Sequence, residues 1–341
     1  MKAIVLSNKG DASQLKYEEI ETPKINDDEV LVKIKAASVN HLDIWVRTGQ
    51  FSPTLPLILG CEGSGDIAEV GKNVKGFKQG DKVLVHPRIT CSKCDYCFEG
   101  NDNLCRNARQ LGVNINGCYA EYVKVPQQNL YLLNDKISYE GAASVPITFG
   151  TAYRALVSLA KIKPGEVVLI QAAGSGVGTA AIQIAKLAGA KVIAAAGSDE
   201  KLDKAKELGA DFLVNYYRNQ NFDEEVKYLT NGNGVDAVIE QVGGYILPKS
   251  LNCLKKNGRL VTLGTTAGNK IEIDAQHFYR NNLTMLGTSG TTHREVKAAF
   301  ELVKDGKIKP VIDRTFPLKD ASIAHKYMEE RKNFGKIILK P

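Results

Sequence analysis

Two hydrophobic patterns divide the chain. In residues 1–122, short apolar or alternating runs recur between turn pairs such as Asn26-Asp27 and Gly80-Asp81. Runs of this length between turn signals predict β-strands. The predicted strands of this part are Ala3–Leu6, Val30–Ala36, Gly65–Val70 and Lys82–Val85. We therefore expect an irregular, mostly antiparallel β-rich domain over residues 1–122.

From about Val123 the pattern changes to apolar strands that alternate with helices. Predicted strands cover 167–172, 191–195, 212–215, 237–240, 259–264 and 283–287, and predicted helices cover 151–160, 179–187, 199–208 and 221–229. Such alternation predicts an α/β domain with a doubly wound parallel sheet. We expect this domain to span residues 123–289. The tail of residues 290–341, with a helix at 295–304 and a strand at 336–339, should return to the β-rich domain.

A glycine-rich turn joins the first predicted strand of the α/β domain to a helix. It reads Val167-Val-Leu-Ile-Gln-Ala-Ala-Gly-Ser-Gly-Val-Gly178. In this context, backbone N–H groups and the positive end of the helix can bind a pyrophosphate. The match to G-x-G-x-x-G is not strict, since Ala173 and Ser175 replace two glycines, and an ordinary tight turn is the alternative. The expected dinucleotide contacts are Gly174, Ser175, Gly176, Val177 and Gly178.

The following strand ends in Ala195-Ala-Gly-Ser198, which suggests the type of cofactor. An NAD-preferring site usually has Asp or Glu at this point, for the ribose hydroxyls. Here Ser198 can donate a hydrogen bond to a 2′-phosphate and Lys201 can supply a charge. Asp199 is expected to cap the helix. The sequence therefore favours NADPH, with NADH as the alternative.

Four of the seven cysteines form a C-x2-C-x2-C-x7-C cluster, at Cys91, Cys94, Cys97 and Cys105. Four thiolates from one short loop can close a tetrahedron around Zn²⁺ and leave no open position. We therefore predict one structural zinc per chain, in a lobe of about residues 88–110. An iron–sulfur cluster or four reduced thiols are the alternatives.

Composition and charge exclude several classes of partner. The length of 341 residues suits about two domains, and the 24% of charged residues is ordinary for globular proteins. The net charge of +7 comes from basic residues spread along the chain, so we expect no nucleic acid partner. The first apolar run is four residues long, and no stretch approaches the roughly 18 apolar residues of a membrane span. We expect a cytoplasmic protein that acts on a small molecule and binds no membrane.

Several motifs together resemble the medium-chain dehydrogenase/reductase superfamily, which includes zinc alcohol dehydrogenases and quinone oxidoreductases. The motifs are Ser38-Val-Asn-His-Leu-Asp43, Leu59-Gly-Cys-Glu-Gly-Ser-Gly65, the cysteine lobe, Gly117-Cys-Tyr-Ala-Glu-Tyr122, Thr151-Ala-Tyr153, the glycine turn and Gly335-Lys336. The resemblance implies a Rossmann cofactor domain and a GroES-like β-rich catalytic domain. It also implies a homodimer or homotetramer, often paired through the last strand of the cofactor domain, here Leu283–Gly287. The further cofactor contacts that it implies are Asn40, His41, Thr151, Tyr216, Gly264, Thr288 and Lys336. Lys336 lies where the family often has a pyrophosphate contact, and a plain surface lysine is the alternative.

The resemblance also implies where a second, catalytic zinc would bind in this family. Its Cys, His and Cys ligands fall here at Asn40, Cys61 and about Ile147, while the neighbouring Glu62 is kept. The Ser or Thr that relays the alcohol proton is Leu42. Because one thiol and one carboxylate cannot build the usual three-ligand open site, we expect no catalytic zinc.

Without that metal, reduction of an activated C=C bond is the expected chemistry. Hydride addition to such a bond spreads charge into an enolate, which a few hydrogen-bond donors can stabilise. The candidate catalytic residues are Asn40, Cys61 and Glu62. The Asn40 amide could donate to a substrate carbonyl or orient the nicotinamide ribose, and a loop hydrogen bond is its ordinary alternative. A zinc-type alcohol or aldehyde dehydrogenase and a non-catalytic NADPH-binding protein are the competing functions.

Overall fold

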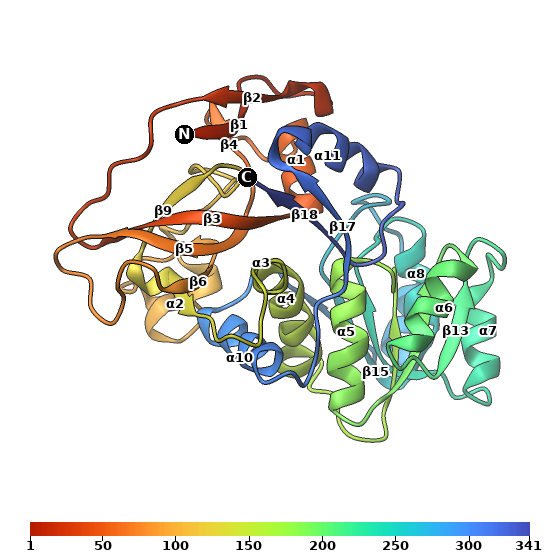
Figure 1. Ribbon diagram of the computed structural model, residues 1–341. Coiled ribbons are helices and arrows are strands. Elements are labelled where there is room, and N and C mark those ends of the chain that lie inside the picture. Colours follow the sequence, from red (N-terminus) through yellow and green to blue (C-terminus); the bar gives the residue numbers. More distant parts are fainter. The chain divides into compact units, whose positions relative to one another are not determined.

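The computed structural model describes all 341 residues, in two units (Figure 1). The first unit combines Met1–Gly150 with Thr291–Pro341, and the second is Thr151–Gly290. The return of the tail to the β-rich part is confirmed, because β18 (Lys336–Lys340) pairs with β3 (Glu29–Val39).

The expected boundary at residue 122 is wrong, because residues 123–150 belong to the first unit. Two short strands hold this segment there. β9 (Tyr122–Pro126) pairs with β3, and β10 (Leu130–Leu132) pairs with β6 (Lys82–Val85). Backbone pairing thus attaches the segment to the β-rich sheet before the α/β part begins.

The first unit is built on a seven-stranded sheet with the order β10-β6-β5-β3-β18-β17, to which β9 is added at β3. Its remaining strands are β5 (Glu62–Val70) and β17 (Ile312–Pro317). Only β17 and β18 run parallel, so the mostly antiparallel prediction holds. Smaller sheets pair β2 (Leu15–Glu19), β1 (Lys2–Leu6) and β4 (Leu57–Ile58), and β7 (Arg88–Ile89) with β8 (Arg109–Gln110). One apolar core includes residues from both β1 and β18.

Five helices belong to the first unit: α1 (His41–Thr48), α2 (Asp95–Phe98), α3 (Tyr139–Ala143), α10 (His293–Lys304) and α11 (Ala321–Glu329). Sequence reasoning did not predict α1. Its start is fixed by Asp43, whose carboxylate accepts a hydrogen bond from the Asn40 N–H at 2.8 Å. Its end is the left-handed Gly49, with φ 88°. This helix therefore begins directly after a candidate catalytic residue.

The second unit contains the predicted parallel sheet, with six strands in the order β13-β12-β11-β14-β15-β16. The strands are β11 (Val167–Ile170), β12 (Lys191–Ala196), β13 (Phe212–Asn215), β14 (Val235–Glu240), β15 (Leu254–Thr262) and β16 (Thr284–Gly287). The order reverses at β11, which is the doubly wound arrangement. The helices that follow the strands are α5 (Gly176–Leu187), α6 (Asp199–Glu207), α7 (Phe222–Leu229), α8 (Ile246–Asn252) and α9 (Ala275–Arg280).

The helix expected over 151–160 is irregular. Regular α-helix is confined to α4 (Gly150–Tyr153), and π-helical turns lie on both sides, at Val145–Phe149 and Arg154–Leu159. Pro146 lies in the first of these turns. Such π turns widen a helix locally and re-aim backbone groups, and they often occur near functional sites.

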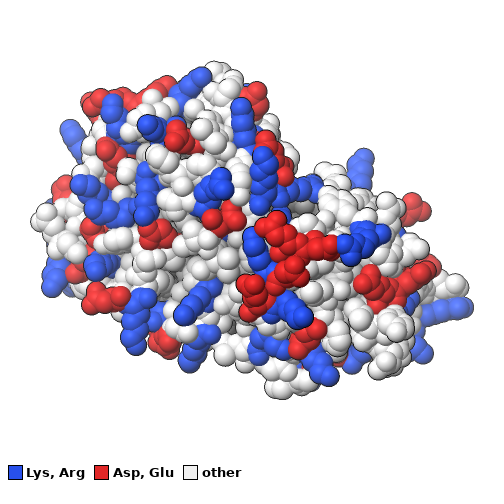
Figure 2. All heavy atoms as spheres, turned by 45° about the vertical axis from the view of Figure 1, so that its right-hand side comes forward, with Lys and Arg blue, Asp and Glu red and all other residues white.

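Figure 2 shows basic and acidic side chains intermixed over the face that it draws. No helix combines the length and the apolar character that a membrane crossing requires.

Candidate functional site

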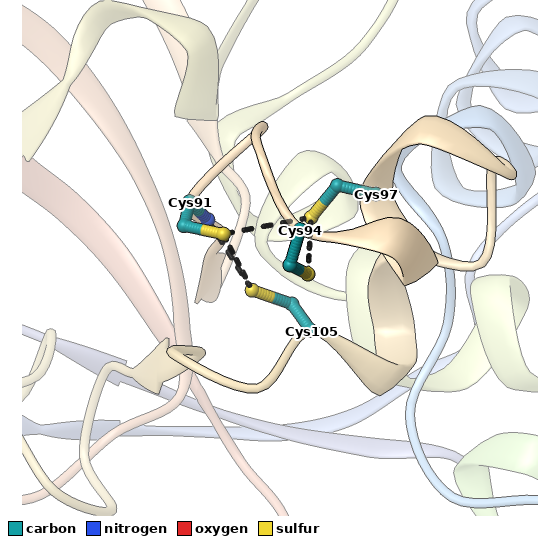
Figure 3. Close-up of side chains that lie close together, drawn as sticks. All are labelled: Cys91, Cys94, Cys97 and Cys105. Carbon is teal, nitrogen blue, oxygen red and sulfur yellow. Dashed lines mark hydrogen bonds between the residues drawn. The ribbon is translucent and has the colours of Figure 1, made fainter.

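The four clustered cysteines converge as their spacing predicts (Figure 3). All four sulfur atoms lie within 4.8 Å of one another. The Sγ–Sγ distances are 3.5 Å for Cys91 and Cys105, 3.6 Å for Cys94 and Cys97, and 4.0 Å for Cys91 and Cys97. A tetrahedral Zn²⁺ with bonds of about 2.3 Å separates its sulfurs by about 3.8 Å. The cluster therefore has the size and the donor set for a zinc ion.

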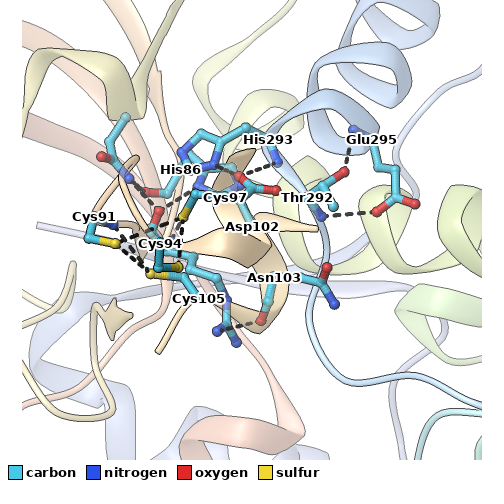
Figure 4. A network of polar contacts seen from close by, with 12 residues as sticks. His86, Cys91, Cys94, Cys97, Asp102, Asn103, Cys105, Thr292, His293 and Glu295 are labelled. Carbon is cyan, nitrogen blue, oxygen red and sulfur yellow. Dashed lines mark hydrogen bonds and ion pairs between the residues drawn. The ribbon is translucent and has the colours of Figure 1, made fainter. Parts of the chain in front are cut away.

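The cysteine lobe is fastened to the start of α10 (Figure 4). Asp102 accepts hydrogen bonds from the backbone N–H of His293 at 3.2 Å and from its Nδ1 at 2.5 Å. His86, which is fully buried, stacks on the His293 ring with the centroids 4.0 Å apart. Burial holds the pKa of His86 well below its ordinary value, so this stack is not doubly charged at neutral pH. The carboxylate of Asp102 also complements the positive end of the helix.

In the second unit, the glycine turn lies at the carboxyl ends of the central strands. Ser175 caps α5, since its Oγ accepts from the Gly178 N–H at 2.9 Å and donates to Gln241 Oε1 at 2.9 Å. A Cβ at Gly178 would lie 2.5 Å from the Ala172 carbonyl oxygen, so only glycine permits this close approach of helix and strand. The N-terminal N–H groups of a helix capped in this way can receive a pyrophosphate.

The end of β12 differs in detail from the prediction. Ser198, not Asp199, caps α6, with its Oγ 3.4 Å from the Lys201 N–H. Asp199 instead accepts from Asn215 Nδ2 at 2.8 Å and pairs with Arg218. Arg218 was missed from the sequence, although a basic residue soon after the third strand is a usable signal. The side chains of this ion pair are 53% and 72% exposed, so Arg218 can exchange Asp199 for another anion at little cost.

The other expected cofactor residues are placed as follows. Thr151 lies in α4, and Tyr216 follows β13 with its ring edge-on to Tyr217. Gly264 follows β15, and a Cβ there would lie 2.7 Å from the Gln241 carbonyl oxygen. Thr288 accepts a hydrogen bond from Arg154 Nε at 2.7 Å. In the first unit, His41 opens α1, and burial lowers its pKa.

A buried polar cluster surrounds Glu62 in the first unit. Its Oε1 accepts hydrogen bonds from Ser38 Oγ at 2.5 Å, from Asn40 Nδ2 at 3.0 Å and from Lys336 Nζ at 2.8 Å. Its Oε2 accepts from the Ile147 N–H at 2.7 Å. We call Ser38, Asn40, Glu62, Ile147 and Lys336 the Glu62 cluster. It joins two of the candidate catalytic residues, Asn40 and Glu62, to the final strand.

Lys336 lies inside this cluster, with its side chain 4% exposed. Besides Glu62, its ammonium donates to Asn40 Oδ1 at 2.6 Å and to the Val39 carbonyl oxygen at 3.0 Å. An ammonium has three donors, and all three are used here. The pyrophosphate contact expected for Lys336 is therefore not favoured by this geometry.

A second buried network extends from Asp43. Its carboxylate accepts from the Cys61 thiol at 3.3 Å and from the Tyr119 hydroxyl at 3.0 Å. The Tyr119 oxygen lies 3.3 Å from His325 Nε2, and Arg47 Nη1 lies 3.3 Å from His325 Nδ1. Arginine can only donate, so Nδ1 accepts and the proton of neutral His325 is on Nε2. Every hydrogen bond in this network thus points toward Asp43.

Asp43 and His325, two titratable residues of this network, are expected to have opposite effects on how stability depends on pH. Burial raises the pKa of Asp43 to about 6, although Asn40, Cys61, Tyr119 and Lys336 all favour the carboxylate. Its contribution to stability is therefore present at low pH and is lost as the pH rises through about 6. Burial, with the charges of Arg47 and His41, lowers the pKa of His325 to about 3. Its contribution is present above the ordinary value near 6.5 and is lost as the pH falls toward 3.

We expect Asp43→Asn and His325→Gln to change the pH profile of thermal stability in opposite directions. Between pH 7 and pH 5, the wild type should gain melting temperature relative to Asp43→Asn, because an amide in place of the carboxylate cannot take up the proton. Over the same pH interval, the melting temperature of the wild type should fall relative to that of His325→Gln, because the unfolded chain takes up a proton on His325 that the folded protein does not. Differential scanning fluorimetry at four pH values measures both differences. Parallel profiles for the two variants would contradict the assignment.

The residues at the family's catalytic zinc positions do not fit a zinc ion. The oxygen of Asn40 already accepts from an ammonium at 2.6 Å. Cys61 is fully buried, donates to Asp43, and has a pKa raised well above its ordinary value, mainly by burial. Ile147 offers no ligand atom, and its N–H is bound to Glu62. A lysine charge lies where a metal would need anionic or neutral donors.

Two family models match the chain. One, described as "Alcohol dehydrogenase GroES-like domain", matches residues 26–135. The other, described as "Zinc-binding dehydrogenase", matches residues 176–305. The matched ranges fall mainly in the first and second units respectively.

Similar proteins match over the full length. A protein of Sulfolobus acidocaldarius named "NAD-dependent alcohol dehydrogenase" is 37% identical, over 100% of this chain and 99% of its own. A protein of Sulfurisphaera tokodaii named "Acryloyl-coenzyme A reductase" is 33% identical, over 100% of both chains. A solved structure described as an NAD-dependent alcohol dehydrogenase is 40% identical, with a TM-score of 0.97 and full coverage of both chains.

Proposed function

We propose a carbon–carbon double-bond reductase function for this chain, which belongs to the family of zinc-type medium-chain alcohol dehydrogenases. Family membership makes it an oxidoreductase, and the finer reaction is our proposal. NADPH is the proposed hydride donor, and the substrate is an enone, a quinone or an enoyl thioester such as acryloyl-CoA. The similarity to a protein named acryloyl-CoA reductase supports that substrate class.

The Glu62 cluster is the observation that carries this proposal. Reducing a plain aldehyde develops charge on one oxygen, and a Lewis acid usually stabilises it. Here Asn40, Cys61, Ile147 and Lys336 leave no ligand set for such a metal. Reducing a conjugated double bond delocalises the charge into an enolate, which hydrogen bonds can stabilise. We assign that role to the Asn40 amide.

The bond changes balance without a metal. A bound nicotinamide cofactor would supply the hydride for the β-carbon, the C=C π electrons would move into the enolate, and a solvent proton would complete the α-carbon. Asn40 donates a hydrogen bond to the enolate oxygen. For the cysteine lobe we propose one zinc ion with a purely structural role, because four thiolates leave no position for substrate.

The second candidate function is alcohol or aldehyde oxidation. The names of similar proteins favour it, since the 37% identical relative and the 40% identical structure are both described as NAD-dependent alcohol dehydrogenases. Such a reaction would need an electrophile other than zinc at Asn40 and Cys61. The residues of the Glu62 cluster offer no set of free metal ligands that could hold another metal ion there.

A substrate panel with parallel zinc analysis tests these candidates. Enones, quinones, acryloyl-CoA and crotonyl-CoA would be offered with NADPH and NADH, and primary and secondary alcohols with the oxidised cofactors. We expect C=C reduction with about one zinc per chain. Alcohol-dependent cofactor reduction with two zinc ions per chain would overturn the proposal. Tight NADPH binding without turnover of any substrate would favour a non-catalytic role.

The cofactor preference is tested by paired variants at the end of β12. If Arg218, Ser198 and Lys201 receive a 2′-phosphate, Arg218→Ser should weaken NADPH binding by roughly tenfold and leave NADH binding unchanged. Asp199→Ser is the matched control, because it removes the other member of the same ion pair. Fluorescence titration of both cofactors measures these constants. Weaker NADH binding by Asp199→Ser, with NADPH unaffected in Arg218→Ser, would assign NADH as the cofactor.

We also propose a homo-oligomer that pairs through β16. This strand is at the edge of the parallel sheet, and Met285 on it is 37% exposed. An exposed edge of this kind offers unpaired backbone groups to a second copy. Analytical ultracentrifugation reports the oligomer number.

A further inference from the structure

We propose that Lys336 is a positioning residue that orients and polarises the Asn40 amide, in place of the metal that the family carries at this site. The inference rests on the proposed function for its catalytic consequence. The contacts among Lys336, Asn40 and Glu62 are independent of the proposed function. Three features support the inference: the burial of the Lys336 ammonium, the fixed orientation of the Asn40 amide, and the second Asn40 N–H, which has only a weak acceptor.

The first step is the burial of the Lys336 ammonium. Its side chain is 4% exposed and Glu62 is 0% exposed, so water does not screen the pair. Buried charges persist only when their hydrogen-bonding capacity is filled. The three acceptors of Lys336 are a carboxylate, an amide oxygen and a backbone carbonyl. The ammonium is thus committed to this cluster and is not free for a solvent-borne phosphate.

The second step is the orientation of the Asn40 amide. Its Oδ1 faces the Lys336 ammonium at 2.6 Å, and its Nδ2 faces Glu62 Oε1 at 3.0 Å. Turning the amide over would bring NH₂ against the ammonium and the oxygen against the carboxylate. Both contacts would be repulsive, so charge alone selects one orientation. Lys336 and Glu62 therefore act on the two ends of one amide.

The third step concerns the second N–H of Asn40. One Nδ2 proton is held by Glu62, while the remaining contact, to the Ser38 carbonyl oxygen, is 3.5 Å long. A bond of this length is weak, so this N–H is available to a substrate oxygen without any change in the orientation of the amide. A cation on the amide oxygen draws electron density from the nitrogen and strengthens its N–H as a donor. Lys336 thereby supplies through Asn40 the positive charge that a metal would supply directly.

The test compares Lys336→Met with Asn40→Ala and with the double variant, in the full-length protein. With the best enone of the panel, Lys336→Met should lower kcat by roughly a hundredfold. The NADPH dissociation constant should stay within twofold. The double variant should be no slower than Asn40→Ala alone, because the two residues act as one unit. Lys336→Arg keeps a cation and should retain an intermediate kcat.

Two outcomes would overturn the proposal. An NADPH dissociation constant raised tenfold or more at unchanged kcat would make Lys336 a pyrophosphate contact. Losses that multiply in the double variant would make Lys336 a structural residue that acts independently of Asn40.

A second measurement does not depend on the activity. In protein labelled with ¹⁵N-asparagine, the side-chain NH₂ signals of Asn40 are identified by their loss in Asn40→Ala. We expect the two proton shifts to be widely separated in the wild type and to move toward free-amide values in Lys336→Met. Unchanged signals would overturn the orientation argument even if the wild type reduces enones. Shifted signals in a protein that reduces no enone would separate failure of the proposed function from failure of this inference.

Discussion

Replacing Cys105 by Ser is expected to abolish binding of the zinc ion proposed for the cysteine cluster and to unfold the lobe of residues 88–110. Cys105 is buried, and its sulfur also accepts the Cys91 N–H at 3.3 Å. A serine hydroxyl is a poor zinc ligand, and three thiolates leave the site open. Structural zinc contributes about 10–16 kcal/mol of apparent binding free energy in small zinc domains, so loss of one ligand removes most of the order of this lobe.

Elemental analysis and limited proteolysis measure this result. Zinc should fall from about one per chain to a small fraction, and new cleavage should appear within 88–110. Cys253→Ser is the matched control, because Cys253 is also buried but lies in the second unit, where its thiol donates to the Lys249 carbonyl oxygen. It should keep its zinc. A Cys105→Ser protein with full zinc content and an intact lobe would contradict the structural assignment.

Replacing Glu62 by Ala is expected to destabilise the first unit by about 3–5 kcal/mol, because it leaves the buried Lys336 ammonium without its counter-charge. Glu62 also accepts from Ser38, Asn40 and Ile147, so their donors lose a partner too. Replacing both members of the ion pair, as in Glu62→Leu with Lys336→Met, removes the uncompensated charge. The double variant should regain most of the lost stability.

The single tryptophan makes this measurement specific. Trp45 lies in α1 of the first unit, so its fluorescence during urea unfolding follows that unit alone. Glu19→Ala is the control, since Glu19 and its partner Lys2 also lie in the first unit and their side chains are 73% and 42% exposed. That change should stay within about 0.5 kcal/mol. A Glu62→Ala protein as stable as the control would show that water reaches the cluster.

Local patterns predicted well the parts of the fold that depend on local interactions. The spacing of the cysteines brings four sulfurs within 4.8 Å, as expected from one short loop. The change of hydrophobic period predicted the parallel sheet, because strands buried on both faces are apolar throughout. Helix α1 was not predicted, although the sequence contains signals for both of its ends: Asn40 and Asp43 at the start and Gly49 at the end. A helix of eight residues is too short to show a clear hydrophobic period.

Contacts between distant positions could not be predicted in this way. Glu62 and Lys336 are 274 residues apart, and nothing in either segment indicates the other. The resemblance suggested a pyrophosphate contact for Lys336, while the structure turns its ammonium toward Asn40 and Glu62. The segment 123–150 was placed in the wrong domain for the same reason. Its strands β9 and β10 are five and three residues long, and only pairing with β3 and β6 shows where they belong.

The pairing of β18 with β3 has a consequence for the order in which the protein is made. Strand β3 and Glu62 leave the ribosome early, and the entire second unit is synthesised before Lys336 appears. Domains generally fold as units during synthesis, so the second unit can form while the first still waits for its last strand. Until then the Glu62 carboxylate has no ammonium partner. The first unit can therefore complete its sheet and its buried ion pair only after the second unit has been made.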